Sequence, residues 1–213
     1  MRKPRVLLAD DHRVVAEGLR GLLDPYFEVV GVVSDGRELL AAAARLDPDV
    51  VVLDISMPSL NGIETARQLR AENSRAKVVF LTMHREVAYA ARSLEAGASG
   101  FVLKHSAPSE LVTAIREALN GGTYVTPQIA GQLLDPLRRP GAAGAAASGE
   151  LTLRQREILQ LVGEGRSAKE IASLLGISRR TAEFHKARLM KALGLQTTAE
   201  LIQYAVRTGL SPL

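Results

Sequence analysis

A continuous apolar run, Val50-Val51-Val52-Leu53, ends at a charged residue, Asp54. Branched apolar residues in such a run predict a strand that is buried on both faces, as strands are in a parallel sheet. A carboxylate that directly follows this strand lies at the edge of the sheet rather than in its core. In open α/β sheets, ligands bind outside the carboxyl ends of the strands. Asp54 is therefore the first candidate functional residue.

Strand and helix patterns alternate through the first 120 residues. Their short connections predict five βα units, and such units form a doubly wound parallel sheet with helices on both faces. We therefore expect residues 1–121 to form a five-stranded, flavodoxin-like α/β domain. The predicted strands are 5–10, 28–33, 50–54, 77–82 and 100–103, and the predicted helices are 12–23, 36–46, 62–71, 86–96 and 108–119.

The remainder of the chain has a different character. Residues 140–149 carry no charge and no large side chain, so they cannot form a core. We expect 122–149 to be a linker, with one possible short helix at 127–134. Beyond it, Ser or Thr caps and Gly stops bound helices at 153–162, 168–175, 179–193 and 199–207. These predict a small all-α helix-turn-helix domain over 150–213, with 179–193 as its recognition helix.

The charge distribution separates the two expected domains. Residues 1–120 carry 15 basic and 16 acidic side chains, whereas 151–213 carry 10 basic and 5 acidic ones. A basic excess confined to the helical domain favours a polyanion such as double-stranded DNA. The chain has no cysteine, which excludes disulfides and thiolate metal sites. No apolar stretch approaches about 20 residues and no signal core is present, so we expect a cytoplasmic protein without membrane contact.

Polar residues follow or end four of the five predicted strands. Asp10 and Asp11 end the first, Thr82 ends the fourth, and Lys104 follows the fifth. Parallel strands end at one edge, so these residues and Asp54 would share a pocket. Three clustered carboxylates repel one another and attract a divalent cation. The set suits phosphoryl transfer to Asp54, with Mg²⁺ and Lys104 neutralising the phosphoryl oxygens and Thr82 donating a hydrogen bond.

The same motifs resemble a known family. Residues 1–120 resemble the receiver domain of bacterial two-component response regulators, and 151–209 resemble the helix-turn-helix domain of the NarL/FixJ (LuxR-type) subclass. The receiver motifs are Asp10-Asp11, Asp54-Ile-Ser-Met-Pro58 with Gly62, Leu81-Thr82 and Gly100-Phe-Val-Leu-Lys104. The helix-turn-helix motifs include Leu151-Thr152, Lys169-Glu170-Ile171-Ala172, Ile177-Ser178, His185 and Leu193-Gly194.

This resemblance implies a role for each site residue. Asp54 would accept a phosphoryl group from a sensor histidine kinase. The backbone carbonyl of Ser56 would complete the Mg²⁺ site, and Phe101 would swing inward as Thr82 moves. Phosphorylation would then control dimerisation and promoter binding, with a homodimer on DNA or in the phosphorylated state.

The recognition helix offers a second set of candidates. An i, i+3, i+4, i+7 pattern places Arg180, Glu183, Phe184 and Ala187 on one face, where Phe184 could touch a thymine methyl group. The family commonly has Lys where this chain has Glu183, and a carboxylate there could accept from cytosine N4. The basic side chains suit phosphate contacts. The further DNA-binding candidates are Lys169, Ser178, Arg179, Thr181, Lys186 and Arg188.

Several residues also have simpler interpretations. Asp10 or Asp11 alone would be a helix cap, and Phe101 or Phe184 alone a core aromatic. A patch of Leu201, Ile202 and Ala205 would serve either dimerisation or packing within the monomer. We interpret His12 and His105 as surface residues, and we expect Met83, Ser56 and His84 to rim the phosphoryl site.

Two other functions fit parts of the chain. An aspartyl-phosphate hydrolase typically needs a second acid two residues after its nucleophile, and here that residue is Ser56, so we expect no enzyme. A regulator that works through partner binding without phosphate is the third possibility. The intact set of five polar residues at the strand ends argues against it.

Overall fold

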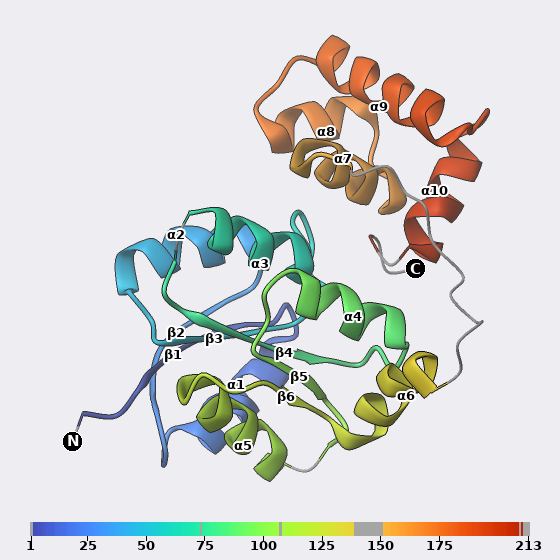
Figure 1. Ribbon diagram of the computed structural model, residues 1–213. Helices are drawn as coiled ribbons and strands as arrows, with labels where there is room; N and C mark the ends of the chain where they lie inside the picture. The colour runs from blue at the N-terminus through green and yellow to red at the C-terminus, as the bar shows by residue number, and fades with distance from the viewer. Residues whose placement is uncertain (1, 73, 107, 139–150, 209, 211–213) are drawn as a thin grey trace. The chain divides into compact units, whose positions relative to one another are not determined.

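Six parallel strands form the sheet of the larger unit, in the order β2-β1-β3-β4-β5-β6 (Figure 1). The strands are β1 (Arg5–Ala9), β2 (Glu28–Val33), β3 (Val50–Leu53), β4 (Lys77–Thr82), β5 (Gly100–Leu103) and β6 (Tyr124–Val125). The apolar run that predicted a central strand is β3, all four of whose residues are buried. This computed structural model describes residues 2–72, 74–106, 108–138, 151–208 and 210. The chain divides into two units near residue 145.

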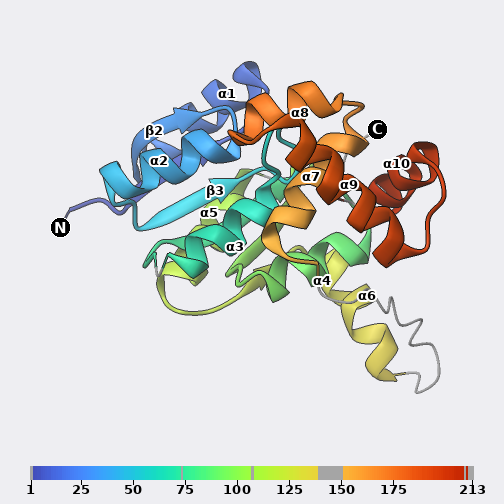
Figure 2. The same ribbon diagram turned by 90° about the horizontal axis from the view of Figure 1, so that it is seen from above.

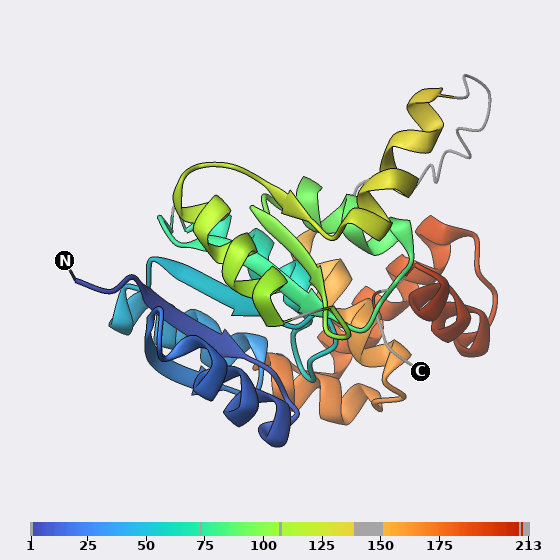
Figure 3. The ribbon, with the colours of Figure 1, turned by 90° about the horizontal axis from the view of Figure 1, so that it is seen from below.

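Helices cover both faces of the sheet and enclose one hydrophobic cluster on each side. α2 (Gly36–Leu46), α3 (Gly62–Ala71) and α4 (Val87–Glu95) lie on one face, which is nearer the viewer in Figure 2. α1 (Arg13–Leu23) and α5 (Pro108–Leu119) lie on the other face, seen in Figure 3 as the dark blue and yellow-green helices. The predicted doubly wound α/β architecture is therefore confirmed.

The prediction of five strands was wrong by one. β6 pairs with β5 through Gly100↔Tyr124 and Phe101↔Val125. The amide of Tyr124 donates to Ser99 O and the amide of Thr126 donates to Phe101 O. Two residues are too few to show an alternating pattern, and α6 begins at Pro127, directly after Thr126. Only the tertiary structure could reveal this strand.

The segment between the two expected domains contains a helix. α6 spans Pro127–Arg138, which extends beyond the 127–134 segment expected to be helical. Its Ile129 is fully buried in the cluster beneath α2, α3 and α4. Residues 139–150 of the expected linker lie outside the described residues.

The described residues of the smaller unit form four helices: α7 (Leu153–Gly163), α8 (Ala168–Leu175), α9 (Arg179–Leu193) and α10 (Thr198–Arg207). The caps predicted from sequence are present, because Thr152, Ser167 and Thr197 each form a capping box and Ser178 accepts from the Thr181 amide. Gly176 and Gly194 end α8 and α9 in the left-handed conformation, which glycine adopts without steric cost. Among the described residues, no helix is long and apolar enough to cross a membrane.

Candidate functional site

Strand pairing brings the acidic residues together. β1 and β3 are neighbours, with Ala9 opposite Leu53, so the residues that follow them are adjacent. Asp10 and Asp54 are 4% and 5% exposed, and they form one cluster with Asp11 and His12 whose potential ligand atoms lie within 4.8 Å of one another. Buried carboxylates this close need a cation, since burial in a low dielectric strengthens their repulsion.

Lys104 supplies part of that positive charge. Its Nζ atom lies 2.6 Å from Asp10 Oδ2 and 2.6 Å from Asp54 Oδ2. Its backbone amide donates to Thr82 O at 2.8 Å, which ties the end of β5 to the end of β4. One lysine therefore bridges the two buried carboxylates, and Asp11 adds a third negative charge at the rim.

The pKa of Asp54 is raised despite its contact with Lys104. Burial raises this pKa, and Asp10 raises it further, while the charge and hydrogen bond of Lys104 lower it without cancelling the effect of burial. The pKa of Lys104 is itself raised: burial lowers it, but Asp54 and Asp10 outweigh burial. A divalent cation beside the carboxylates would favour their charged forms.

His12 was interpreted from sequence as a surface residue, and it also borders the acidic cluster. Its Nδ1 lies 2.8 Å from Asp11 Oδ1 and its backbone amide donates to Asp10 Oδ1. The side chain is nevertheless 67% exposed. Its position directly after the two acids was the available sequence signal for this placement.

The donor set fits a hard cation such as Mg²⁺. Three carboxylates, at Asp10, Asp11 and Asp54, come within reach of a single ion, and oxygen is the donor that Mg²⁺ prefers. The Ser56 amide donates to Asp54 Oδ1 at 3.4 Å, which places the Ser56 backbone beside the cluster. His12 offers nitrogen, which suits Mg²⁺ less well.

Thr82 and Phe101 are both fully buried near these residues. The Thr82 hydroxyl oxygen accepts a hydrogen bond from the His84 amide at 3.2 Å. The Thr82 carbonyl accepts from the backbone amide of Lys104, the residue whose side chain contacts Asp54. Phe101 packs in the cluster beneath α2, α3 and α4. The site therefore has a buried hydroxyl and a buried aromatic ring within the two strands that end beside Lys104.

A polar bridge spans the loops that follow β3 and β4. Ser56 Oγ and His84 Nε2 are 2.7 Å apart, and the His84 ring stacks on Tyr89 with centroids 4.0 Å apart. Burial lowers the pKa of His84, which favours its neutral form, although Glu86 and Asp54 act in the opposite direction. Met83 lies between Thr82 and His84 and is 63% exposed.

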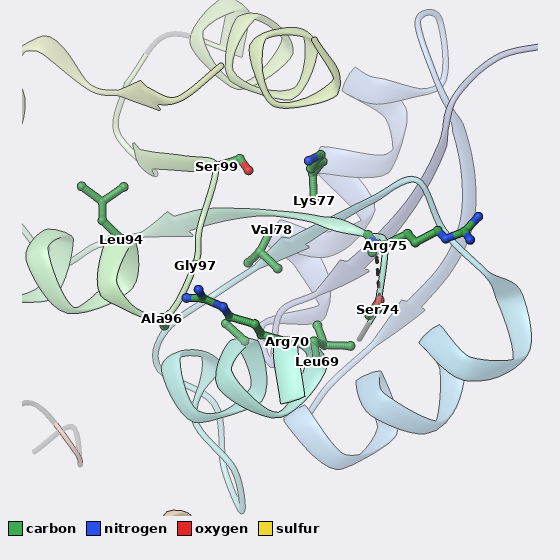
Figure 4. Close-up of a pocket in the computed structure, with 12 residues that line it drawn as sticks. Leu69, Arg70, Ser74, Arg75, Lys77, Val78, Leu94, Ala96, Gly97 and Ser99 are labelled. Atoms are coloured by element: carbon green, nitrogen blue, oxygen red, sulfur yellow. Dashed lines mark hydrogen bonds between the residues drawn. The ribbon is translucent and has the colours of Figure 1, made fainter. Parts of the chain in front are cut away.

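A hollow lies at the opposite end of the strands. It has a volume of about 720 Å³ and lies between α3, the start of β4 and the α4–β5 connection (Figure 4). Lys77, the first residue of β4, lines it, whereas Thr82 is the last residue of that strand. None of the predicted site residues lines this hollow.

In the smaller unit, α9 presents most of the predicted DNA-binding residues to solvent. Its inner face is held by Ala182 and Leu189, which are 1% and 0% exposed. The exposed candidates are Lys169, Ser178, Arg179, Arg180, Glu183, Phe184, Ala187 and Arg188, while Thr181 and Lys186 are half-buried. The side chains that could reach a major groove therefore lie opposite the packed face of the helix.

Two side-chain pairs organise this exposed face. Arg179 Nε lies 2.8 Å from Glu183 Oε1, an i, i+4 ion pair, so Glu183 is already engaged. The Arg188 guanidinium lies 5.7 Å from the centre of the Phe184 ring. Phe184 is 56% exposed, so its interpretation as a core residue is wrong.

Two of the three residues in the expected dimer patch belong to the core. Leu201 and Ala205 are fully buried in the cluster that holds this unit together, where they join Ile158 and Leu189. The dimerisation alternative for these two residues is therefore wrong, because they pack within the monomer. Ile202 is half-buried.

Comparisons with known proteins agree with both units. Residues 6–116 match the response regulator receiver domain, and residues 149–205 match the luxR family of bacterial regulatory proteins. The chain is 40% identical to the transcriptional regulatory protein MctR of Rhizobium johnstonii, over 98% of this chain and 95% of MctR. It is 36% identical to the transcriptional regulatory protein LiaR of Bacillus subtilis, over 97% and 98% of the two chains.

A solved structure covers both units as well. RcsB from Salmonella enterica serovar Typhimurium, bound to a promoter in the presence of the phosphomimetic BeF3⁻, is 28% identical, with a TM-score of 0.63. The match covers 95% of this chain and 98% of that one. The chain therefore belongs to the response regulators. Within that family it is a transcriptional regulator with a receiver domain and a LuxR-type DNA-binding domain.

Proposed function

We propose that Asp54 is the phosphoacceptor of this regulator and that its phosphorylation controls DNA binding. The observation that carries the proposal is the contact of Lys104 with both Asp54 and Asp10, at 2.6 Å each, in a cluster that also holds Asp11. A structural ion pair needs one carboxylate, not three. The cluster has the composition of a phosphoryl-transfer site, in which charge neutralisation is the main requirement.

The chemistry follows from the positions of these side chains. A carboxylate oxygen of Asp54 attacks phosphorus, an acyl phosphate forms, and the bond to the leaving group of the donor breaks. Lys104 then exchanges its contact with the Asp54 carboxylate for one with a phosphoryl oxygen, because the new group carries about −1.5 to −2 charges. The Thr82 hydroxyl donates to another phosphoryl oxygen.

Mg²⁺ is the proposed cofactor. Asp10, Asp11, Asp54 and the Ser56 carbonyl would hold it, and it would supply charge neutralisation for the incoming phosphoryl oxygens. Asp10 also accepts the His12 amide, which orients its carboxylate at the site.

The proposed partners follow from the family. A sensor histidine kinase would be the phosphoryl donor, and double-stranded promoter DNA would bind the exposed face of α9. RcsB dimers bound to DNA are known, and we propose that this chain also binds as a homodimer, on DNA or when phosphorylated. Dimers of helix-turn-helix domains read half-sites about one helical turn apart. We place the protein in the cytoplasm, where its kinase and DNA would meet it.

Turnover of small phosphorylated substrates is not part of the proposal. Hydrolases that use an aspartyl phosphate place a general acid–base two residues after the nucleophile, and Ser56 occupies that position. Its hydroxyl binds His84, whose pKa is lowered by burial. The acyl phosphate is therefore expected to persist long enough to act as a signal.

The proposal is tested by incubating the full chain with a small acyl-phosphate donor and Mg²⁺. We expect a mass gain of one phosphoryl group together with tighter binding to a DNA duplex selected by the protein from a random library. Intact-mass spectrometry and fluorescence anisotropy measure the two effects. A chain that binds DNA equally well in both states would instead favour a regulator that works without phosphate.

Met83 is expected to shield the acyl phosphate from water. It is 63% exposed next to Thr82, where smaller side chains would leave a more open path to Asp54. We expect Met83→Ala to shorten the acyl-phosphate lifetime about 2- to 10-fold, which is about 0.4–1.4 kcal/mol of activation free energy. Timed loss of the phosphoryl mass measures it, and an unchanged lifetime would refute the role.

Glu183 is expected to influence which DNA sequence is bound. Glu183→Lys removes the carboxylate that could accept a hydrogen bond from cytosine N4. It also replaces the ion pair with Arg179 by a repulsion, which should move the Arg179 side chain. Selection from a random duplex library should then yield a different preferred sequence. If Glu183→Lys only strengthens binding, and equally on all duplexes, Glu183 has no role in sequence readout. Glu183→Gln is the control that removes the charge without reversing it.

A further inference from the structure

Thr126 lies immediately after β6, the strand that pairs with β5. It is 5% exposed, and it stands between the last strand of the sheet and α6. Both its backbone and its side chain bind other elements of the larger unit. None of the receiver motifs described above includes it.

The backbone of Thr126 connects β5 with α6. Its amide donates to Phe101 O at 2.9 Å, and its carbonyl accepts from the amides of Ile129 and Ala130 in the first turn of α6. The residue opposite Phe101 in the strand pair is Val125. A change in the backbone of Phe101 therefore acts directly on the residue that begins the helix.

The side chain of Thr126 continues the sheet beyond the end of β6. Its Oγ1 accepts a hydrogen bond from the Leu103 amide at 3.3 Å. A backbone carbonyl would ordinarily fill this position in a ladder, but the chain has already turned into α6. Leu103 directly precedes Lys104, so the hydroxyl fixes the end of the strand that presents the lysine to Asp54.

Glu110 of α5 holds this hydroxyl in place. Thr126 Oγ1 donates to Glu110 Oε2 at 2.9 Å, so the oxygen is used both as donor and as acceptor. Tyr124 also interacts with this carboxylate, and its pKa is raised first by burial and then by the charge and hydrogen bonding of Glu110. The three residues fasten β6 to α5 and β5.

Packing completes the connection on the other side. Ile129 in α6 is fully buried in the same hydrophobic cluster as Phe101 and Ala90 of α4. A closely packed interior transmits a displacement of one side chain to its neighbours. α6 is thereby bound to Phe101 through both a hydrogen-bonded path and a packed path.

From this arrangement we propose that Thr126 is the positioning residue that couples the phosphoryl site to α6. Its hydroxyl holds the end of β5 and its backbone starts the helix, so a shift of Lys104 and Phe101 on phosphorylation moves α6. The chain continues from α6 to the DNA-binding unit, and the helix is therefore the route by which the state of Asp54 is passed on. This inference rests on the proposed function of Asp54.

The test compares Thr126→Val, Thr126→Ser and the wild-type full chain at equal phosphoryl occupancy, measured by intact mass. Valine keeps the shape of the side chain and removes the hydroxyl, whereas serine keeps the hydroxyl. We expect Thr126→Val to accept the phosphoryl group and to lose most of the phosphorylation-dependent gain in DNA affinity. Thr126→Ser should retain that gain. Thr113→Val is the matched control, because it removes a hydroxyl from α5 that donates to Ser109 O of the same helix.

The outcomes separate this inference from the proposed function. A full gain in DNA affinity in phosphorylated Thr126→Val would overturn the coupling role. A folded Thr126→Val chain that accepts no phosphoryl group would also overturn it, since the proposal has Thr126 act only after Asp54 has accepted the phosphoryl group. If the wild-type chain itself shows no phosphoryl gain, the proposed function fails instead. Should Thr126→Val not fold, Glu110→Gln weakens the same contact from α5, and its unchanged affinity gain would contradict the proposal.

Discussion

The Asp54→Asn variant should gain no phosphoryl group from a small acyl-phosphate donor and Mg²⁺, whereas the wild-type chain gains one. The amide has nearly the shape of the carboxylate but no anionic oxygen to attack phosphorus. Its DNA affinity should then be the same with and without the donor. Intact-mass spectrometry measures the phosphoryl gain, and fluorescence anisotropy on the same samples measures the DNA affinity.

Two controls make this result specific. Asp47→Asn applies the same chemical change to an exposed aspartate at the end of α2, in a left-handed conformation that asparagine tolerates, and it should be phosphorylated normally. Removing Mg²⁺ with a chelator should abolish the wild-type mass gain. Retention of a full mass gain by Asp54→Asn would identify another acceptor, and Asp10, Asp11 and His12 would be the next residues to replace.

The positions of the site residues were predictable because a parallel sheet converts sequence order into spatial convergence. Each acidic or basic residue followed or ended an apolar run, and all such runs end at one edge. That argument predicted the meeting of Asp10, Asp54 and Lys104. It could not predict that the lysine touches both carboxylates, because side-chain reach depends on the register of β3, β4 and β5.

Other features depended on contacts between distant segments. β6 has two residues, and its existence follows from hydrogen bonds to Ser99 and Phe101 rather than from a local pattern. The bond between Ser56 and His84 likewise joins two loops 28 residues apart. Sequence periodicity carries no information on such pairs.

One ion pair was accessible from the sequence but was not predicted from it. Arg179 and Glu183 are four residues apart on a helix, a spacing at which opposite charges pair. Leu201 and Ala205 share the same spacing, and their small apolar patch suits the core of a four-helix unit as well as a dimer interface. Burial decided between the two alternatives for Leu201 and Ala205.

Gly62 is expected to be the least tolerant position near Asp54. A Cβ atom added there would lie 2.1 Å from the backbone oxygen of Asp54 and 3.1 Å from Ile55 Cα, and backbone atoms cannot give way as a flexible side chain can. The Gly62 amide also donates to Ile55 O, which holds the start of α3 against this loop. We expect Gly62→Ala to lower the free energy of unfolding of the larger unit by about 2–4 kcal/mol. The displaced Asp54 should also accept a phosphoryl group about 10- to 100-fold more slowly.

Gly18→Ala is the matched control, since this glycine lies in the middle of α1 with nothing within 4 Å of the added atom. Alanine should raise the free energy of unfolding by about 0.5–1 kcal/mol, whereas Gly62→Ala lowers it. Gly18→Ala should leave phosphorylation unchanged. Hydrogen exchange of peptides from β3 and α1 during urea unfolding reports on the larger unit alone, because a chain of two units need not unfold in one transition. If Gly62→Ala matched Gly18→Ala in both stability and phosphorylation rate, the close approach of Gly62 to the Asp54 backbone would not be what positions the phosphoacceptor.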